Sequence, residues 1–382
     1  MRIGLLGTRG VPARYGGFET AAEEIGARLV EAGHEVVVYC RNPGQHQKTY
    51  LGMELVNLPA VRSRAAETLS HTALSIGHAL FREQFDVAFV FNAANAPFLP
   101  LLHAAGVPVA LHVDGLEWKR AKWGPRATAY YRWAEHYSTR WADSVIADAL
   151  GIADYLRHTH GIEPLYLPYG APAVSPPSDR VKAQGLEPGG YHLVVARFEP
   201  ENHVYEIVTG YRVSHARLPL VVVGDAPYAN EYRQRVRDAA EGDSRIRLLG
   251  SIWDNDLLDA LYAHSASYLH GHSVGGTNPS LLRAMGAGAP VSAFDVNFNR
   301  EVVTEAGLWF TDPSGVVRCL EQVEDDLGAA RTRGLGGQSD VLVRYRWDDV
   351  AAGYEVLAKE LVARGPGVGR ISRLRDRLHW NK

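Results

Sequence analysis

Cysteine, long apolar stretches and excess charge are scarce in this chain of 382 residues. Cys40 and Cys319 are the only two cysteines and lie far apart, which argues against a disulfide framework and a cysteine-based zinc site. No apolar run approaches the roughly 18 residues of a membrane span, and residues 1–7 resemble a first strand more than a signal peptide. The net charge of −3 gives no basic footprint for nucleic acid. These absences favour a cytoplasmic enzyme or binding protein.

What the chain does contain is a repeated alternation of strand and helix patterns. Its length suits about two domains, and an apolar fraction of 46% lets each bury a core. Residues 2–6 form an apolar run, a glycine loop follows at 7–17, and Phe18 opens a helical spacing that ends at Gly33. An apolar strand at 35–40 completes a βαβ unit, which predicts a parallel sheet with a right-handed crossover.

The alternation continues to about Tyr169, which predicts a first doubly wound domain at 1–170. Further strands are expected at 53–58, 87–91, 107–113, 144–147 and 164–167, with helices at 65–84, 97–105, 124–141 and 149–158, the last capped by Asp148. A linker rich in proline and glycine is expected at 171–190.

A second alternation predicts another domain at 191–346. Its strands are expected at 191–197, 218–223, 245–248, 266–270, 290–293 and 307–310, and its helices at 203–214, 228–239, 254–264 (capped by Asp254), 279–287, 297–303 and 314–329. A final helix at 347–363, with Tyr354, Val356 and Leu357 toward a core, and the tail to 382 are expected to return to the first domain. The fold class is α/β, with two Rossmann-like doubly wound domains and a ligand in the cleft between them.

The stretch at 270–291 is the most informative one for chemistry. It combines a strand end, two adjacent glycines at Gly275 and Gly276, and a helix start, with Asn278 as the cap and Pro279 in the first helical position. A glycine loop that leads into a helix N-terminus is suited to an anion, because the first amides are unpaired and the dipole end is positive.

A dinucleotide site is a competing interpretation of the first glycine loop. Gly4, Gly7 and Gly10 have the wrong spacing for the Rossmann fingerprint, and the second strand ends at Arg41 where an NAD site has an acid. Because Arg41 suits a 2′-phosphate, an NADP oxidoreductase stays open as an alternative.

Four stretches together resemble the GT-B glycosyltransferases of retaining family 4, and within them the bacterial rhamnosyltransferase-like subgroup of polysaccharide biosynthesis. They are residues 7–20, 113–123, 196–202 and 270–285. The resemblance implies transfer of a sugar from a nucleotide diphosphate to an acceptor hydroxyl with retention of configuration, no metal and no cofactor beyond the nucleotide sugar.

The resemblance also implies roles for residues. Arg197 matches the arginine that contacts the diphosphate, and Asp114 occupies a catalytic position beside the donor sugar. Donor contacts are expected at Gly10, Gly16, Gly17, Asn202, His272, Gly275, Gly276, Thr277, Asn278 and Arg283, with Arg9 and Arg14 as further cations. Acceptor contacts are expected at Glu19, Glu117, Trp118 and Lys119.

The chain departs from the family pattern at two positions. Gly275 and Arg283 replace a pair of glutamates, and the second of these usually accepts hydrogen bonds from the nucleotide ribose. The loss of this glutamate costs less binding free energy for a deoxyribose, which has one hydroxyl fewer. This favours dTDP-rhamnose as donor over a UDP-sugar. The alternatives are a UDP-hexose or UDP-N-acetylhexosamine transferase in glycoside biosynthesis, and a catalytically silent sugar-nucleotide or glycan-binding protein.

The segment at 365–382 differs from the rest in charge. It holds Arg370, Arg373, Arg375, Arg377 and Lys382 against the single acid Asp376. Contact with the inner face of an anionic membrane is one expectation for this tail, alongside packing against the first domain. The acceptor is expected to be a glycan, a lipid-linked sugar or a small molecule.

Overall fold

The computed structural model describes residues 1–367, except 14–15, 42–43, 45–46, 62–65, 114, 121–122 and 226–229. The chain divides into two compact units. The first contains residues 1–119 and 123–169 together with the chain from Trp347 onward, and the second contains residues 120–122 and 170–346. Each unit is built on its own largely parallel sheet, which confirms the predicted α/β class with two Rossmann-like domains.

The first unit is organised around a sheet in the order β3-β4-β2-β1-β5-β6-β7-β8, in which only the β3–β4 pair is antiparallel. Strands β5 and β6 are buried along their whole length, as befits parallel strands covered on both faces. The strands are β1 (Arg2–Leu6), β2 (Glu35–Cys40), β3 (Thr49–Tyr50), β4 (Met53–Asn57), β5 (Val87–Phe91), β6 (Val109–Val113), β7 (Ser144–Ala147) and β8 (Leu165–Tyr166).

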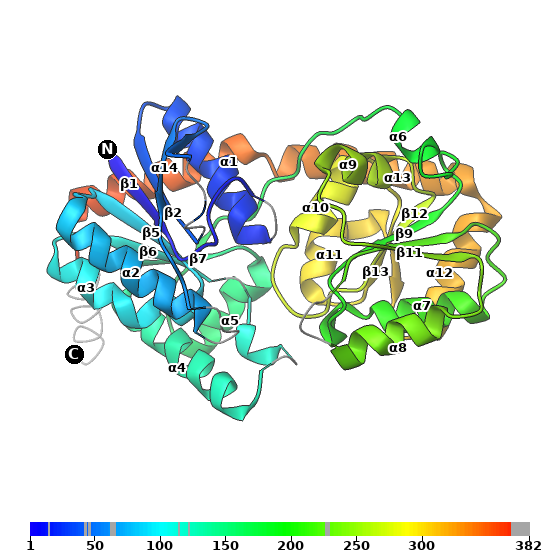
Figure 1. Ribbon diagram of the computed structural model, residues 1–382, viewed down its shortest axis with the longest axis horizontal. Helices are drawn as coiled ribbons and strands as arrows, with labels where there is room; N and C mark the ends of the chain where they lie inside the picture. The colour runs from blue at the N-terminus through cyan, green and yellow to red at the C-terminus, as the bar shows by residue number, and fades with distance from the viewer. Residues whose placement is uncertain are drawn as a thin grey trace, which may run out of the picture. The chain divides into compact units, whose positions relative to one another are not determined.

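Helices cover both faces of this sheet. Helices α1 and α14 pack together on one face, and α2 to α5 lie on the other (Figure 1). They are α1 (Gly17–Glu31), α2 (Glu67–Arg82), η1 (Ala93–Phe98), α3 (Leu99–Ala104), η2 (Glu117–Lys119), α4 (Pro125–Trp141), α5 (Leu150–His160) and α14 (Trp347–Arg364).

Helix α14 completes the core of the first unit although it follows the second unit in sequence. The Tyr354 side chain is fully buried, its hydroxyl lies 2.7 Å from His112 Nδ1 on β6, and its ring centroid is 4.9 Å from that of Phe89 on β5. Leu357 is buried as predicted. The same prediction for Val356 is wrong, because its side chain is 56% exposed.

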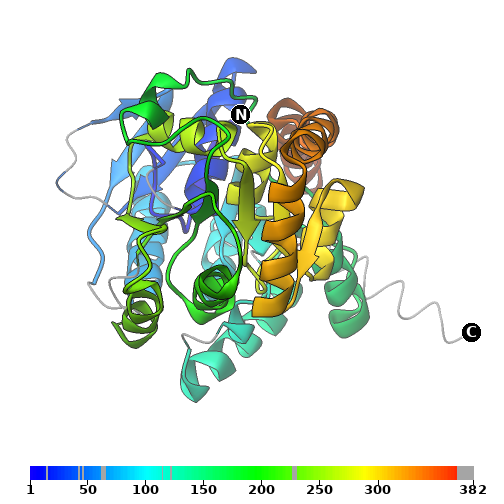
Figure 2. The same cartoon turned by 90° about the vertical axis from the view of Figure 1, so that its right-hand side faces the viewer.

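The second unit has an all-parallel sheet in the order β11-β10-β9-β12-β13-β14. Helices α7, α8 and α12 cover one face and α9, α10 and α13 the other (Figure 1), and Figure 2 shows orange α12 beside β14. The strands are β9 (His192–Val195), β10 (Leu220–Val223), β11 (Ile246–Gly250), β12 (Ser267–His270), β13 (Val291–Phe294) and β14 (Leu308–Phe310). The helices are α6 (Asp179–Lys182), η3 (Pro200–Asn202), α7 (Val204–Val213), α8 (Asn230–Ala240), α9 (Asn255–Ala263), α10 (Pro279–Gly286), α11 (Asn297–Val303), η4 (Thr304–Ala306), α12 (Pro313–Asp325) and α13 (Leu327–Arg344).

Helix α13 is the largest difference from the sequence prediction. The expected helix at 314–329 ends at Asp325, and Asp326 caps a new helix by accepting a hydrogen bond from the Ala329 amide. Four glycines at 328, 334, 336 and 337 lower the helix propensity of this segment. Close packing explains the glycine at position 334, because a Cβ there would lie 2.5 Å from the Gly288 carbonyl oxygen. Tertiary contact therefore overrides propensity.

One smaller prediction is also wrong. Helix α5 begins at Leu150 with Ala149 as its cap residue, so Asp148, which is fully buried, does not hold the predicted cap position. The short helix α6 lies within the segment predicted as a linker at 171–190. By contrast, Asp254 and Asn278 cap α9 and α10 as predicted, each accepting hydrogen bonds from first-turn amides.

Candidate functional site

The loops that follow β9 and β12 are joined by hydrogen bonds at the carboxyl end of the second sheet. Ser273 donates to the Glu201 carbonyl from its amide at 2.9 Å and from its hydroxyl at 3.1 Å. His203 Nδ1 lies 2.7 Å from the Gly271 carbonyl oxygen. A Cβ on Gly271 would lie 2.1 Å from the Asn202 carbonyl oxygen, so the close approach of the loops requires glycine there. Ligands of open parallel sheets bind at this edge.

Arg197 lies in the first of these loops with its side chain 35% exposed, and its guanidinium is 3.9 Å from the Glu199 carboxylate. Its carbonyl oxygen accepts a 2.9 Å hydrogen bond from the Asn202 side-chain amide. Asn202 itself is only 1% exposed. Part of the Arg197 side chain is therefore accessible, and its contact with a diphosphate stays a prediction. The predicted donor residue Asn202 holds the Arg197 backbone in place.

His270 and His272 stack on one another at the end of β12, with ring centroids 4.4 Å apart. Burial lowers the pKa of His270 to about 3, and burial together with the nearby cations holds the pKa of His272 well below its usual value. Both imidazoles are therefore neutral at pH 7, and they can exchange hydrogen bonds with a ligand without adding charge. The Asn299 side-chain amide fixes the His272 carbonyl at 2.9 Å.

Arg120 is a second cation in this cluster, and the sequence analysis did not single it out. It belongs to residues 120–122, which group with the second unit, and its guanidinium lies 4.0 Å from the Glu201 carboxylate. Arg120 and Arg197 both contribute to the low pKa of His272, so both guanidinium groups lie near that ring. The only sequence signal for Arg120 was its place within the stretch at 113–123.

The glycine loop and the start of α10 form the next part of the cluster. Gly275 has φ +147° and open space where a Cβ would lie, so no neighbouring atom crowds this side of the loop. Gly276 and Thr277 are buried, and the Asn278 side chain accepts hydrogen bonds from the Ser280 amide and hydroxyl. The helix that follows has eight residues and begins at Pro279.

Arg283 is held by helix α9. Its Nε donates to Asp259 Oδ1 at 2.5 Å, and one terminal nitrogen donates to the Asn255 carbonyl at 3.3 Å. The ion pair raises the pKa of Arg283 despite its burial. Asp259 is therefore the ion-pair partner of Arg283, and the predicted contact of Arg283 with the donor nucleotide stays a prediction.

In the first unit, the predicted donor residues Gly10, Gly16 and Gly17 lie between β1 and the start of α1, and residues of the same unit hold this loop in place. Gly10 has φ +101°, and a Cβ there would lie 2.4 Å from Cys40 Sγ, so tight packing on β2 requires glycine. Glu19, 8% exposed in the first turn of α1, accepts a 2.8 Å hydrogen bond from the Arg9 amide. Burial raises the pKa of Glu19. Gly16 is exposed and Gly17 half-buried at the start of α1. Glu19 therefore anchors this loop.

The predicted acceptor residues Glu117, Trp118 and Lys119 make up η2. Glu117 accepts a 3.2 Å hydrogen bond from Trp123 Nε1, and the Arg132 guanidinium lies 4.4 Å from the centre of the Trp118 ring. Trp118 Nε1 donates at 3.1 Å to Glu135, a carboxylate that no sequence motif singled out. Glu135 thereby ties η2 to helix α4.

Glu135 is 5% exposed and also meets two residues of α5. It accepts a 2.7 Å hydrogen bond from the Tyr155 hydroxyl, and His160 Nε2 lies 2.9 Å away. Burial and this carboxylate raise the pKa of Tyr155 to about 12. One buried carboxylate therefore satisfies three donors from η2 and α5.

We expect Glu135→Ala to destabilise the first unit. Removing a shared acceptor leaves buried donors unpaired, at about 1–3 kcal/mol each. Urea denaturation followed by tryptophan fluorescence measures the loss, with Glu163→Ala as the control, since Glu163 is a fully exposed acid paired with Arg157. Equal denaturation midpoints for the two variants would contradict this role of Glu135.

Some predicted residues lie outside the described part of the chain. These are Asp114, Arg14 and residues 368–382 of the tail. Within the described residues, no group of three or more His, Cys, Asp or Glu side chains is placed to hold a metal ion, and no helix is long and apolar enough to cross a bilayer. Independence of metals stays a prediction.

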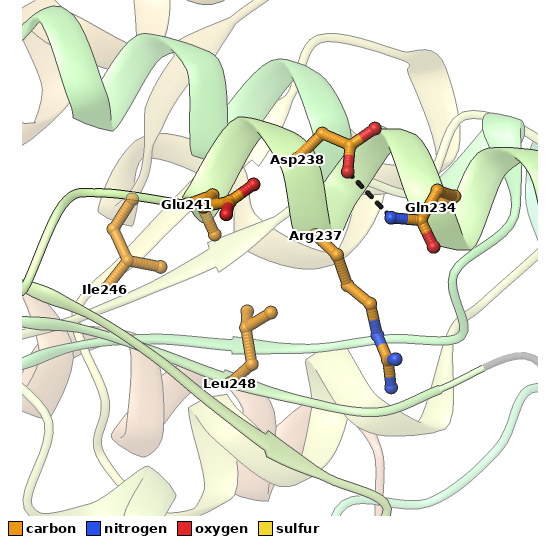
Figure 3. A pocket seen from close by; sticks show the side chains of 7 residues that line it. Gln234, Arg237, Asp238, Glu241, Ile246 and Leu248 are labelled. Atoms are coloured by element: carbon orange, nitrogen blue, oxygen red, sulfur yellow. Dashed lines mark hydrogen bonds between the residues drawn. The ribbon is translucent and has the colours of Figure 1, made fainter.

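A hollow of about 290 Å³ lies between α8 and β11 and contains none of the predicted site residues. Figure 3 shows its lining, in which Gln234 donates a 2.7 Å hydrogen bond to Asp238 beside Arg237. Because it lies at the outer edge strand of the second sheet, it is separate from the loops after β9 and β12.

Two family models match the chain, one mainly over the first unit and one within the second. Residues 2–172 match a domain of unknown function, DUF1972, and residues 191–326 match the family Glycosyl transferases group 1. The second match contains the loops after β9 and β12, α10 and Arg283.

Two curated relatives match over about a third of the chain. The O-antigen chain mannosyltransferase B of Escherichia coli is 28% identical over 145 residues, covering 36% of this chain and 38% of the relative. The GtfA subunit of the UDP-N-acetylglucosamine–peptide N-acetylglucosaminyltransferase of Streptococcus gordonii is 29% identical over 121 residues, covering 31% and 23%. The match thus spans less than two fifths of each relative.

Solved structures resemble the chain over nearly its whole length. Sucrose-phosphate synthase from Thermosynechococcus elongatus has a TM-score of 0.81 at 20% identity, covering 95% of this chain and 99% of that one. Anabaena Alr3699/HepE in complex with UDP-glucose has a TM-score of 0.76 at 17% identity, covering 94% and 100%. At these identities the likeness establishes the fold. The chain therefore has the GT-B fold, and residues 191–326 of its second unit match the Glycosyl transferases group 1 family.

Proposed function

We propose that the protein is a retaining glycosyltransferase that moves a sugar from a nucleotide diphosphate donor to an acceptor hydroxyl. The observation that carries this proposal is the cluster at the carboxyl ends of β9 and β12. There, half-exposed Arg197 lies near the neutral His272 ring, which stacks on His270, and Gly275 in the loop after β12 has open space where a side chain would lie. Such a set suits a leaving diphosphate, because fixed donors stabilise the charge that develops on it.

Each part of the cluster has a role in this reaction. Arg197 binds the diphosphate through its planar guanidinium, and Arg120 supplies a second cation near His272. His270 and His272 offer uncharged hydrogen-bonding groups. Because the loops are hydrogen-bonded to one another, these groups need little reorganisation on binding.

For the donor we propose dTDP-rhamnose, and for the acceptor a glycan, a lipid-linked sugar or a small molecule met by η2. Arg283 favours a deoxyribose donor such as dTDP-rhamnose, because a guanidinium has no atom that can accept a hydrogen bond from a ribose hydroxyl. The alternative is a UDP-hexose or UDP-N-acetylhexosamine, supported by the UDP-linked names of one relative and several structural neighbours.

A panel of nucleotide sugars, scored for transfer and for donor hydrolysis with and without EDTA, tests the donor and the absence of a metal requirement. Binding without turnover would favour the silent sugar-nucleotide-binding protein.

We expect Arg283→Glu to shift nucleotide preference toward ribose. A carboxylate at this position accepts hydrogen bonds from a ribose hydroxyl, and each such bond contributes on the order of 1.5–3 kcal/mol. Calorimetric titration of UDP and dTDP should therefore show the ratio of their Kd values moving toward UDP by roughly tenfold or more. Arg300→Glu is the matched control, because Arg300 on α11 also forms an ion pair with an aspartate, Asp295, in the loop before that helix. An unchanged ratio would place Arg283 outside the nucleotide site.

A further inference from the structure

Glu201, in the loop after β9, is a buried acid with little to stabilise its charge. Its side chain is 3% exposed, and neither carboxylate oxygen accepts a hydrogen bond of ordinary geometry from the described residues. Glu199, two positions earlier, has a side chain that is 13% exposed. A buried carboxylate that accepts no hydrogen bond does not recover the free energy that it loses on leaving water. Stability of the loop therefore does not explain the presence of Glu201.

Two arginines of the same cluster face these acids from beyond hydrogen-bonding distance. The Arg120 guanidinium lies 4.0 Å from Glu201 Oε1, and Arg197 Nη1 lies 3.9 Å from Glu199 Oε1. The ion pair of Arg283, in comparison, closes to 2.5 Å. Opposite charges attract one another at this range, but these two pairs lack the short hydrogen bonds that make a buried ion pair strong. The acids therefore balance the charge of the arginines without binding them tightly.

Three imidazoles also belong to this cluster. His270 and His272 are neutral at pH 7, because burial lowers the pKa of both rings. The charges of both arginines and of His203 lower the pKa of His272 further, so these groups lie near its ring. His203 Nδ1 lies 2.7 Å from the Gly271 carbonyl oxygen, and its ring stacks on that of Phe294 with centroids 4.0 Å apart. The two glutamates therefore lie in a group of cationic and neutral side chains.

We propose that Glu199 and Glu201 are the counter-anions of Arg120 and Arg197 before the donor binds, and that this carboxylate pair takes up a proton from solvent when a diphosphate binds. The inference rests on the proposed transfer reaction, because it places the diphosphate at these arginines. Like charges that share a buried site cannot all stay ionised. A proton on the pair restores the balance of charge, and the protonated carboxyl can donate a hydrogen bond to a phosphate oxygen.

Glu201 is the acid best suited to hold this proton. Burial, and after it the neighbouring Glu199 carboxylate, raises the pKa of Glu201, whereas Arg120 lowers it. A diphosphate that neutralises Arg120 removes the opposing effect, so the pKa of Glu201 is higher in the complex than in the free protein. Binding is therefore accompanied by proton uptake at any pH between these two values, and it weakens as the pH rises through the higher one.

Calorimetric titration of the full chain tests the proposal. The probes are dTDP-rhamnose and UDP-glucose, because a diphosphate esterified at both ends has no proton of its own to exchange near neutral pH. Titration at one pH in PIPES and in Tris buffer gives the number of protons taken up, since the two buffers differ in their enthalpy of ionisation. We expect net uptake that approaches about one proton per nucleotide sugar, and a Kd that rises by up to about tenfold per pH unit.

Substitution of each acid identifies the group that takes the proton. Glu201→Gln should remove most of the uptake and make the Kd nearly independent of pH, because an amide stays neutral and still donates a hydrogen bond. Glu199→Gln removes one negative charge from the same site and should also lower the Kd at about pH 8. It keeps the test decisive if Glu201→Gln does not fold, which circular dichroism melting reports.

Two controls separate the pair from other titratable groups. Glu241→Gln changes an exposed acid of the same unit, on α8 beside the hollow of Figure 3, and it should leave the uptake unchanged. His203→Gln should keep the uptake as well, although it removes a titratable ring of the cluster.

The possible contrary results are distinct. Binding of a nucleotide sugar by the wild type without proton uptake would overturn this inference and leave the donor site in place. Uptake that persists in both glutamate variants, or that disappears only in His203→Gln, would assign the proton to another group. Weaker binding by folded Glu199→Gln and Glu201→Gln would mean that the acids support the site and do not compete with the diphosphate. If the wild type bound no nucleotide sugar, both this inference and the proposed function would be wrong.

Discussion

Replacing Arg197 by alanine should lower sugar transfer about a hundredfold to a thousandfold, with little loss of stability. Removing one fixed donor to a developing negative charge costs roughly 2.7–4 kcal/mol of transition-state stabilisation. The Arg197 side chain is 35% exposed and the Asn202 bond involves its backbone, so the truncation leaves the loop intact. Turnover with saturating donor measures the effect, and thermal unfolding measures stability. Arg197→Lys should recover only part of the activity, because an ammonium lacks the planar fork.

Arg237→Ala is the matched control for this experiment. Arg237 is an exposed arginine of the same unit, on α8 beside the hollow of Figure 3, and it belongs to neither site loop. Its replacement should leave turnover close to that of the wild type. If Arg197→Ala also kept near-wild-type turnover, Arg197 would not stabilise the leaving group, and the proposed donor site would lose its main residue.

Tyr354→Ala should cost the first unit about 3–5 kcal/mol, the usual cost of removing a large buried ring. The ring packs against Phe89, and its hydroxyl lies 2.7 Å from His112, which burial keeps neutral with a pKa of about 3. The variant therefore loses a core ring and leaves His112 Nδ1 without this partner. Urea denaturation of the full chain, followed by circular dichroism, measures the decrease. Tyr354→Phe should cost less, about 1–3 kcal/mol, because only the hydroxyl is lost.

Val356→Ala is the control for Tyr354→Ala, because it truncates a residue of the same helix that does not pack in the core. Val356 lies two residues from Tyr354 but is 56% exposed, so its truncation should change the free energy of unfolding by no more than about 0.5 kcal/mol. Similar costs for Tyr354→Ala and Val356→Ala would mean that α14 contributes to stability through its helical structure alone. The packing of Tyr354 on β5 and β6 would then be unimportant.

Apolar spacing along the chain was sufficient for the fold class. Two runs of alternating strands and helices predict two parallel sheets, because strand and helix patterns have different periods and short parallel crossovers permit few topologies. The caps of α9 and α10 were also accessible from sequence, since Asp254 and Asn278 bond to amides two or three residues away. Local hydrogen bonds of this kind need no knowledge of the rest of the chain.

What the sequence left undetermined depends on contacts between distant residues. Helix α13 forms despite four glycines because Gly334 fits against Gly288, 46 positions earlier in the chain, and no local pattern contains that contact. Val356 and Tyr354 both suit a core by composition, and only the packing of α14 on the first sheet decides between them. The outward position of Phe81 on α2 is likewise visible only once the sheet is in place.

The candidate site also has features that the sequence predicts and features that only the tertiary structure shows. Its glycine loop, its arginine at position 197 and its strand-end location follow from the sequence and a family resemblance, because they lie in continuous motifs. The sequence could not indicate that Asn202 supports the Arg197 backbone, that Arg120 lies near His272, or that Glu135 anchors Trp118. The last two relations join residues from different loops or helices, and the first depends on how the loop after β9 folds back on itself. Burial and charge at such a site depend on which segments the tertiary structure brings together, and that is the part that the order of residues does not state.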